Sequence, residues 1–131
     1  MPYRRTTNGI TVSVEPRFIA ERSEPEDDRF VWAYTVEIEN GSPDTVQLLA
    51  RHWIITDANG KLEEVRGPGV VGEQPVIEPG ERFGYTSACP LPTPSGIMVG
   101  SYRMRSAAGL AFDVEVPAFS LDSPHARRIL N

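Results

Sequence analysis

Near its middle the chain reads Val65-Arg66-Gly67-Pro68-Gly69-Val70-Val71-Gly72-Glu73-Gln74-Pro75, and this stretch decides between two fold classes. Its glycines have the spacing G-x-G-x-x-G, which wraps a pyrophosphate when a strand precedes the motif and a helix opens out of it. Here β-branched Val70 and Val71 stand inside the motif, and Pro75 and Pro79 follow it. Because these residues prevent a helix of useful length from starting there, the stretch predicts a crossover between strands.

The rest of the chain favours β-structure. Aromatic and β-branched residues alternate with polar ones most clearly over residues 30–39, as in a half-buried strand. Polar turns rich in Gly, Pro, Asn and Asp separate such segments. The predicted strands cover residues 10–14, 30–39, 46–56, 61–65, 82–88, 96–106 and 110–117. Seven or more short strands without a convincing helix predict an all-β fold, an antiparallel β-sandwich or barrel.

Length and composition set the broad class. The 131 residues suit one domain spanning 1–131, with a flexible N-terminus over 1–7 and a C-terminal tail over 123–131 that forms at most one helical turn. No apolar run approaches the roughly 20 residues of a membrane span. The net charge of −5 argues against binding to nucleic acid or to an acidic membrane surface. A single cysteine and an N-terminus without an apolar segment predict a cytoplasmic setting.

Two readings of the glycine stretch follow. In the structural reading, the glycines take positive φ angles or let two backbones approach at a sharp crossover. In the functional reading, the backbone around Gly67, Gly69 and Gly72 forms a nest of N–H groups that accepts phosphate or pyrophosphate oxygens. Arg66 and Arg51 would add charge-assisted contacts to that anion. An anion nest at Gly67, Gly69, Gly72 and Arg66 is therefore the candidate binding site, without the helix that true dinucleotide binding needs.

The other reactive residues form no recognisable catalytic or metal-binding pattern. His52 and His125 lack the spacing of metal ligands. The acidic turn at residues 24–28 lacks the ordered spacing of a calcium loop, so we expect it to face water. Cys89 has no histidine neighbour in the sequence that would activate its thiol. The sequence therefore predicts a protein that is not an enzyme and has no metal site and no cofactor.

Several motifs, taken in order, resemble those of the ApaG family. They are the hairpin R-x-W-x-I-x-D-x-x-G at residues 51–60, the glycine stretch at 65–75 with its G-x-Q-P, the strands P-G-E-x-F-x-Y-x-S at 79–87 and G-x-M-x-G-x-Y at 96–102, and F-x-V-x-V-P-x-F-x-L at 112–121. The similarity runs from about residue 8 to the C-terminus, the size of a whole domain. Several motifs in the same order are far more specific than any one of them.

The resemblance implies an immunoglobulin-like, fibronectin type III-like antiparallel β-sandwich of about seven or more strands, in agreement with the strand pattern. Members of the family occur as stand-alone bacterial proteins and inside larger eukaryotic proteins, including F-box proteins and a polymerase-interacting protein. Bacterial members are linked to magnesium and cobalt phenotypes and to a neighbouring dinucleoside-tetraphosphate hydrolase gene. None of these links defines a reaction, because a fold does not supply one.

Two functions stay open on the sequence. The leading hypothesis is a non-enzymatic protein-interaction module whose unidentified partner docks on a sheet face, a sheet edge or the loops. The alternative is a small-molecule binder or sensor for phosphate, pyrophosphate or a nucleotide at the loop of residues 67–72. Homodimerisation through exposed edge strands also stays open, with Pro16 and Pro43 as candidate edge protection.

Overall fold

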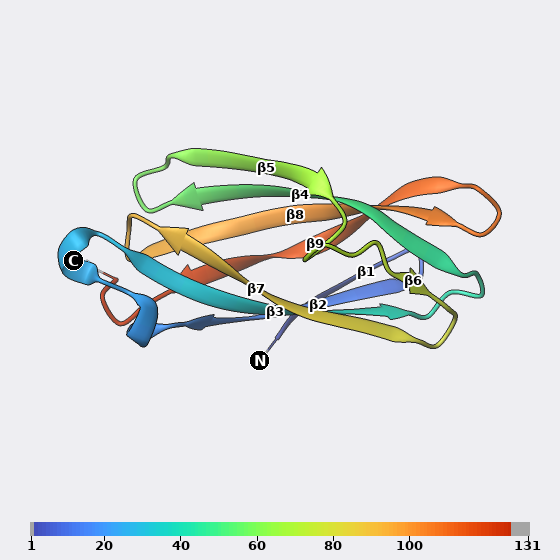
Figure 1. Cartoon of the computed structure of the whole chain (residues 1–131), viewed down its shortest axis with the longest axis horizontal. Coiled ribbons are helices and arrows are strands. Elements are labelled where there is room, and N and C mark those ends of the chain that lie inside the picture. Colours follow the sequence, from blue (N-terminus) through green and yellow to red (C-terminus); the bar gives the residue numbers. More distant parts are fainter. Residues whose placement is uncertain (1, 127–131) are drawn as a thin grey trace.

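A computed structural model describes residues 2–126 of the chain and shows nine strands and two short 3₁₀ turns (Figure 1). The strands are β1 (Tyr3–Thr7), β2 (Ile10–Phe18), β3 (Phe30–Asn40), β4 (Val46–Asp57), β5 (Leu62–Pro68), β6 (Val76–Ile77), β7 (Arg82–Leu91), β8 (Ser95–Ser106) and β9 (Ala111–Asp122). The turns are η1 (Ala20–Arg22) and η2 (Pro25–Asp27). The all-β prediction is confirmed.

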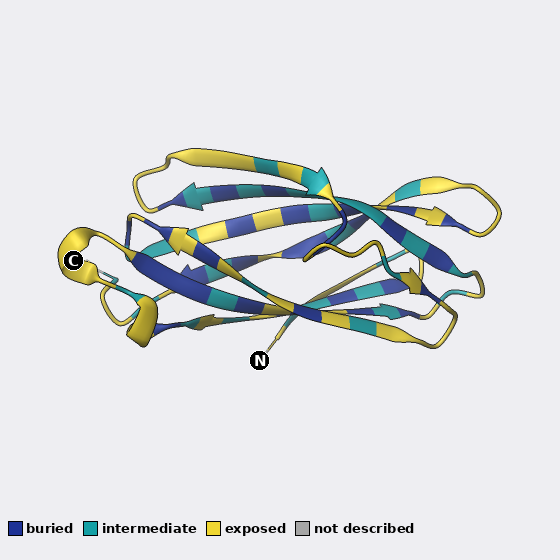
Figure 2. Cartoon of the chain, in the orientation of Figure 1, coloured by how far each residue is buried: buried dark blue, intermediate teal, exposed yellow. Residues whose placement is uncertain are grey.

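The strands form two antiparallel sheets that pack face to face. One sheet has the order β1-β2-β3-β7, and the other has the order β5-β4-β8-β9 with β6 paired to the start of β4. Alternate residues of each strand are buried between the sheets, as the banding along the strands in Figure 2 shows. The chain is thus an immunoglobulin-like, fibronectin type III-like sandwich, as predicted.

An aromatic cluster fills the centre of the core. Trp53 packs edge-on against Tyr102 and Phe119, with ring centroids 6.2 and 6.0 Å apart, and Tyr34 packs against Trp53 from the opposite sheet at 5.6 Å. Trp32, Tyr102 and Phe119 are among the largest fully buried side chains. These rings therefore hold the two sheets together through their large buried area.

The two ends of the chain differ from the sequence expectation. Residues 1–7 were expected to be flexible, yet Tyr3–Thr7 forms strand β1 and pairs with β2 from Ile10 to Val14. The pairing is possible because Asn8 and Gly9 take positive φ angles and turn the chain back in a tight hairpin. At the other end, residues 123–126 form a turn, and the rest of the expected helical turn lies outside the described residues.

The two open sides of the sandwich are unequal. On one side β1 and β9 lie close together, and the Tyr3 hydroxyl is 3.1 Å from Ser120 Oγ. The opposite side faces the viewer in Figure 1, where β5 and β7 are the edge strands of their sheets. Between them passes the glycine loop, defined here as residues 69–75, which leaves β5 and leads to β6. The glycine loop and two of the edge strands therefore lie on one side of the sandwich.

Candidate functional site

A bulge in β4 determines which side chains face the β5–β7 side. The register between β4 and β8 shifts between Leu48 and Ala50, which takes Leu49 out of the regular ladder. After the bulge, Arg51 falls on the inward-facing side of β4, in step with buried Trp53 and Ile55. A charged residue therefore occupies an inward-facing position of β4, in line with core residues but at the edge of the sandwich.

The Arg51 guanidinium is tied to the chain that enters the glycine loop. Its Nη1 donates to the carbonyl oxygens of Pro68 and Gly69, each at 3.0 Å. The guanidinium also covers Gly67, since a Cβ atom at that position would lie 2.9 Å from Arg51 Nη2. Position 67 thus requires glycine, because the Arg51 side chain crosses the backbone there and leaves no room for a Cβ atom.

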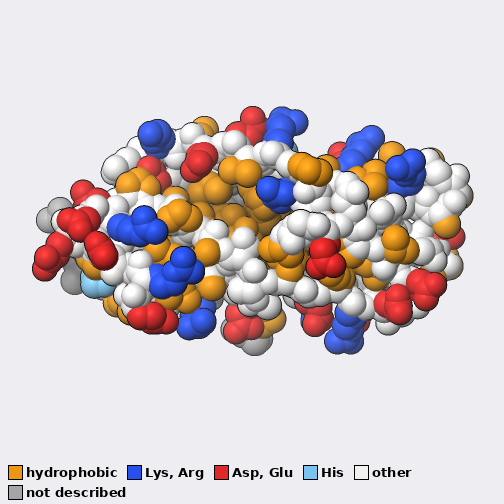
Figure 3. All heavy atoms as spheres, viewed as in Figure 1, with side chains coloured by type: hydrophobic (Ala, Val, Ile, Leu, Met, Phe, Trp, Pro, Cys, Tyr) orange, Lys and Arg blue, Asp and Glu red, His pale blue; other side chains and the backbone are white. Residues whose placement is uncertain are grey.

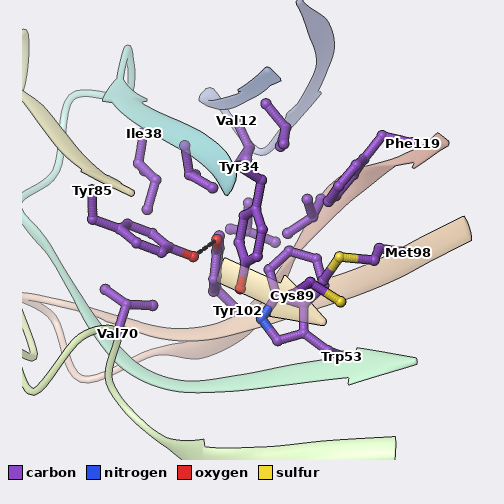
Figure 4. Packing of buried hydrophobic residues seen from close by; sticks show 14 of the residues in the cluster. Val12, Tyr34, Ile38, Trp53, Val70, Tyr85, Cys89, Met98, Tyr102 and Phe119 are labelled. Atoms are coloured by element: carbon purple, nitrogen blue, oxygen red, sulfur yellow. Dashed lines mark hydrogen bonds between the residues drawn. The ribbon is translucent and has the colours of Figure 1, made fainter. Parts of the chain in front are cut away.

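The glycine loop closes part of the gap between the sheets. Val70 is fully buried in the core cluster, and Figure 4 shows it beside Tyr85 of the opposite sheet. The loop is fastened to the bulge, because the Gly69 N–H and Gln74 Nε2 both donate to the Leu49 carbonyl at 2.8 Å. The loop therefore acts as a plug that inserts one valine between two sheets.

The tip of the loop is a two-residue turn of the type I′ class. Val70 and Glu73 exchange backbone hydrogen bonds of 2.8 and 2.9 Å, and both central residues have positive φ, +43° at Val71 and +81° at Gly72. Gly69 is confined more tightly, since a Cβ there would lie 2.1 Å from the Glu73 carbonyl oxygen. The structural reading of the glycines is supported at each position.

The candidate anion nest is distributed over this arrangement. Arg66 and Gly67 lie in β5, which extends to Pro68, three residues beyond the predicted strand, because the β4–β5 ladder continues opposite Arg51 and Ala50. The N–H groups of Gly69 and Val70 donate within the protein. Gly72 stands at the exposed tip of the turn. The four predicted residues therefore do not converge on one point.

A second concave region lies on the outer face of the β5-β4-β8-β9 sheet. It has a volume of about 380 Å³, and we call it the outer-face hollow; its lining residues are Ala50, Arg51, His52, Arg66, Gly67, Ser101, Arg103 and Asp113. It brings Arg66 and Gly67 of the predicted nest together with Arg103, while the Arg51 guanidinium points to the inner side, toward the Pro68 and Gly69 carbonyls. Cationic side chains around a shallow hollow are the donors that an anion would need.

Acidic neighbours offset much of the charge in the outer-face hollow. Glu64 lies 2.7 Å from His52 Nε2 and 3.4 Å from Arg66, and Arg103 lies 3.2 Å from Asp113. The hydrogen bond with His52, followed by the charge of Arg66, lowers the pKa of the Glu64 carboxyl. Ser101 stands opposite His52 in the register of β4 and β8, but within residues 2–126 no hydrogen bond joins the two side chains. This is not the geometry of an activated serine.

A cluster of buried hydroxyl and thiol groups lies inside the β5–β7 side. The Tyr85 and Tyr102 hydroxyls are 2.5 Å apart across the two sheets (Figure 4). Burial raises the pKa of Tyr34, Tyr85 and Tyr102. Burial, with a smaller effect of the Glu63 charge, raises the pKa of the Cys89 thiol to about 11. At neutral pH these groups are neutral, and Cys89 is not poised as a nucleophile.

Near the β4–β5 turn, the side of the sandwich between β5 and β7 stays hollow. This side hollow has a volume of about 330 Å³ and is lined by Ile55, Asp57, Lys61, Leu62, Glu63, Leu91 and Pro92. Figure 3 shows hydrophobic side chains gathered in a depression on this side of the molecule. Leu62 at its rim is 65% exposed. The sequence analysis missed this site, and the only signal for it was the apolar content of three separate strands.

The remaining candidates from the sequence lie apart from these hollows. The acidic turn at residues 24–28 forms η2 and is exposed. His125 packs against the rings of Phe18 and Phe30, with centroids 5.8 and 5.9 Å apart. Within residues 2–126, no three His, Cys, Asp or Glu side chains are grouped so that they could hold a metal ion. Over the same range, no helix has the length and apolar character that crossing a membrane requires.

The fold and its loop place the chain in the class of immunoglobulin-like sandwich domains with a glycine loop plugged between the sheets. A family model for the ApaG domain matches residues 20–106. The chain belongs to the ApaG family. Protein ApaG of Rhodospirillum centenum is 63% identical over 95% of this chain and 96% of its own length, and Protein ApaG of Brucella anthropi is 60% identical over 98% and 99%.

Solved structures agree with this assignment. The putative ApaA protein from Bordetella pertussis superposes with a TM-score of 0.86 at 49% identity, over 89% of this chain and 95% of that one. The C-terminal domain of wzt is similar with a TM-score of 0.55 at 10% identity, over 99% of this chain and 82% of that one. The second likeness concerns the fold alone.

Proposed function

We propose that this chain is a non-enzymatic protein-interaction module that works in the cytoplasm. The observation that carries the proposal is the side hollow, where a partly exposed apolar surface lies between the free edges of β5 and β7. Exposed apolar concavities flanked by unpaired strand edges are surfaces that partner proteins use. On this proposal, the magnesium and cobalt phenotypes linked to the family arise from the effect of the domain on its partner protein.

A pair of leucine variants tests the proposal. Leu62 at the rim of the side hollow and Leu110 in the β8–β9 turn are exposed to a similar extent, 65% and 70%. We expect a partner to co-purify in stoichiometric amount with the wild-type chain and with Leu110→Glu, but not with Leu62→Glu. Both variants must show the wild-type melting temperature. If no partner co-purifies with the wild type, or if Leu62→Glu retains it, the proposal fails.

The second candidate function is the binding of phosphate, pyrophosphate or a nucleotide. The observation that favours it is the outer-face hollow, in which the Arg66 and Arg103 side chains lie beside Gly67. We place this site on the sheet face rather than at the tip of the glycine loop, because the Gly69 and Val70 N–H groups are already bonded.

Titration calorimetry with pyrophosphate, ATP and diadenosine tetraphosphate tests this second function. We expect sub-millimolar binding that is lost in the double variant Arg66→Ala, Arg103→Ala. A matched variant, Arg4→Ala on β1, should bind as the wild type does, since Arg4 lies on the other sheet. If none of the three anions binds below 1 mM (about −4 kcal/mol), the function is excluded.

A further inference from the structure

Three of the four sheet edges in this sandwich are protected. The short strand β1 carries Arg4 and Arg5 and lies against β9. Strand β9 is also covered on that side by β2. Strand β5 carries charged residues and ends at Pro68. Short length, charge, proline and a covering strand are the usual devices that stop an edge from pairing with another chain.

Strand β7 has none of these devices over most of its length. Between Arg82 and Pro90 it has no charged residue and no proline, and among the described residues 2–126 it pairs with β3 alone. The bond from the Asn40 N–H to the Glu81 carbonyl sets the phase of the ladder, so odd-numbered residues of β7 bond to β3. The N–H and C=O groups of Thr86 and Ala88 therefore point to the free side.

Pro90 fits the same phase. It is even-numbered, so its missing N–H would face the free side and not β3, which explains why β7 continues through a proline to Leu91. The available edge thus lies over Thr86 and Ala88 and ends at Pro90. Leu91, the last residue of β7, lines the side hollow directly beneath that edge.

The side hollow adds a charge preference to this edge. Glu63 faces inward from β5, opposite Ile55, and its charge is felt by Cys89 of β7 across the hollow. Within residues 2–126, Glu63 takes part in no ion pair. Asp57 and Lys61 also line the hollow, so its lining carries two carboxylates against one amine, and this net negative charge favours a lysine or arginine on whatever fills it.

We propose that the C-terminal half of β7 binds an extended segment of a partner protein as an added strand. Alternate apolar side chains of that segment enter the side hollow against Ile55 and Leu91, past Leu62 at its rim, and a lysine or arginine reaches Glu63. Backbone bonds at Thr86 and Ala88 supply part of the affinity, and the hollow supplies selectivity. The inference rests on the proposed interaction function and names the chemistry of its partner.

A second copy of the chain is a poorer occupant of this edge. Strand β7 of a second copy would present no positive charge to Glu63 between its residues 83 and 91. Each chain also carries a net charge of −5, which opposes close approach of two copies. The occupant is therefore assigned to another protein with a basic, alternating segment.

Selection of peptides against the full chain tests the inference. A phage library of random twelve-residue peptides is panned on the wild-type protein, and the dissociation constants of the selected peptides are measured by fluorescence anisotropy. We expect sequences with alternating apolar residues and at least one lysine or arginine. Binding should weaken about tenfold or more in Ala88→Pro, which removes a free-side donor, and about tenfold in Glu63→Lys.

The matched control is Glu64→Lys, the same change one residue further on the opposite face of β5, which should leave the affinity within about twofold because Glu64 lies beside His52 on the outer sheet face, away from the side hollow. If Ala88→Pro fails to fold, the comparison of Glu63→Lys with Glu64→Lys decides alone. The inference is overturned if no peptide is selected, if the charge variants behave alike, or if sedimentation shows a dimer that Glu63→Lys alters. Should Leu62 prove necessary for a cellular partner while peptides ignore β7, the interaction function stands and only the added strand is wrong.

Discussion

At the residue scale, each of the three glycines of the motif is required for a different structural reason. Gly67 lets the Arg51 guanidinium cross the strand, Gly69 lets the Glu73 carbonyl approach, and Gly72 supplies a positive φ angle in open space. A match to G-x-G-x-x-G thus arises here from packing and turn geometry. The spacing alone cannot distinguish these demands from phosphate binding, because both favour residues without a Cβ.

This assignment predicts unequal costs for two alanine substitutions. Gly69→Ala should destabilise the protein by about 3 kcal/mol or more, because the new Cβ meets backbone at 2.1 Å and the φ angle of +59° is also unfavourable. Gly72→Ala should cost only about 1 kcal/mol, since it meets strain but no atom within 4 Å. Urea unfolding followed by tryptophan fluorescence measures both. Equal costs would contradict the packing account.

The buried thiol gives a second residue-scale prediction. Cys89 is 4% exposed, and its pKa is raised to about 11 by burial. We expect no reaction with an aromatic disulfide reagent at pH 8 in the folded protein. In urea the thiol regains its ordinary pKa of about 8.5, and we expect full reaction within minutes. Rapid labelling of the folded protein would show that Cys89 is accessible and that the β5–β7 side opens more than the packing allows.

At the element scale, the glycine loop joins a stable anchor to a strained tip. Val70 anchors it in the core, whereas Val71 is a β-branched residue with a φ angle of +43° and 54% exposure. Such residues rarely take this conformation, at a cost of about 1–2 kcal/mol. The strain is held in place by the two hydrogen bonds between Val70 and Glu73 and by the burial of Val70.

Replacing the strained residue should therefore stabilise the protein. Val71→Asn creates the Asn-Gly pair that two-residue type I′ turns prefer, so we expect a gain of about 1 kcal/mol in the free energy of unfolding. Chemical denaturation measures the gain, and Val76→Asn, at a site of similar 59% exposure in β6, is the control that should not gain. A loss of stability in Val71→Asn would mean that the turn differs from the one described.

Most elements could be predicted from the sequence, and their ends were the weaker part. Period-two alternation located the long strands, and the Asp57–Gly60 turn formed as expected, with Gly60 at a φ angle of +83°. Strand β7 continues beyond its predicted end because the proline there faces a free edge. Strand β9 continues past Pro117 because a shift in its register with β8 accommodates the interruption. Both differences depend on which strands lie next to β7 and β9, and the local sequence does not determine these neighbours.

The candidate site was less predictable than the fold. The bulge at Leu49 decides that Arg51 faces the core edge, and a bulge leaves no clear mark in a run of apolar and polar residues. The sequence predicts Arg66 from its position beside the glycines, and the structure places it on an outer sheet face, where it lines the same hollow as Arg103 of β8. Contacts between distant strands such as these follow from sheet order, which single-residue patterns do not determine.

At the scale of the whole molecule, the buried tyrosines link stability to pH. The pKa values of Tyr34, Tyr85 and Tyr102 are raised in the folded state by burial. Their contribution is fully present below the unfolded-state pKa of about 10 and is lost as the pH rises above it, because only the unfolded chain then releases the protons.

We therefore expect the free energy of unfolding to fall steeply above about pH 10. Tyr85 and Tyr102, which stay protonated in the folded state, give a slope approaching about 2.7 kcal/mol per pH unit; Tyr34 adds to this fall, and Cys89 adds a smaller one from about pH 8.5. Urea unfolding at intervals from pH 7 to 11 measures the curve. A flat stability curve across pH 9–11 would show that the hydroxyl cluster is hydrated in the folded protein.

The sandwich as a whole has one closed side and one open side, and the account of function depends on the open one. On the proposed function, a partner protein docks at the side hollow between β5 and β7. The most direct measurement is photo-crosslinking in cells with a benzophenone amino acid placed at Leu62 or, as a control of similar exposure, at Leu110. We expect a discrete protein adduct from Leu62 and none from Leu110; adducts from neither position, or equally from both, would show that no partner docks at the side hollow.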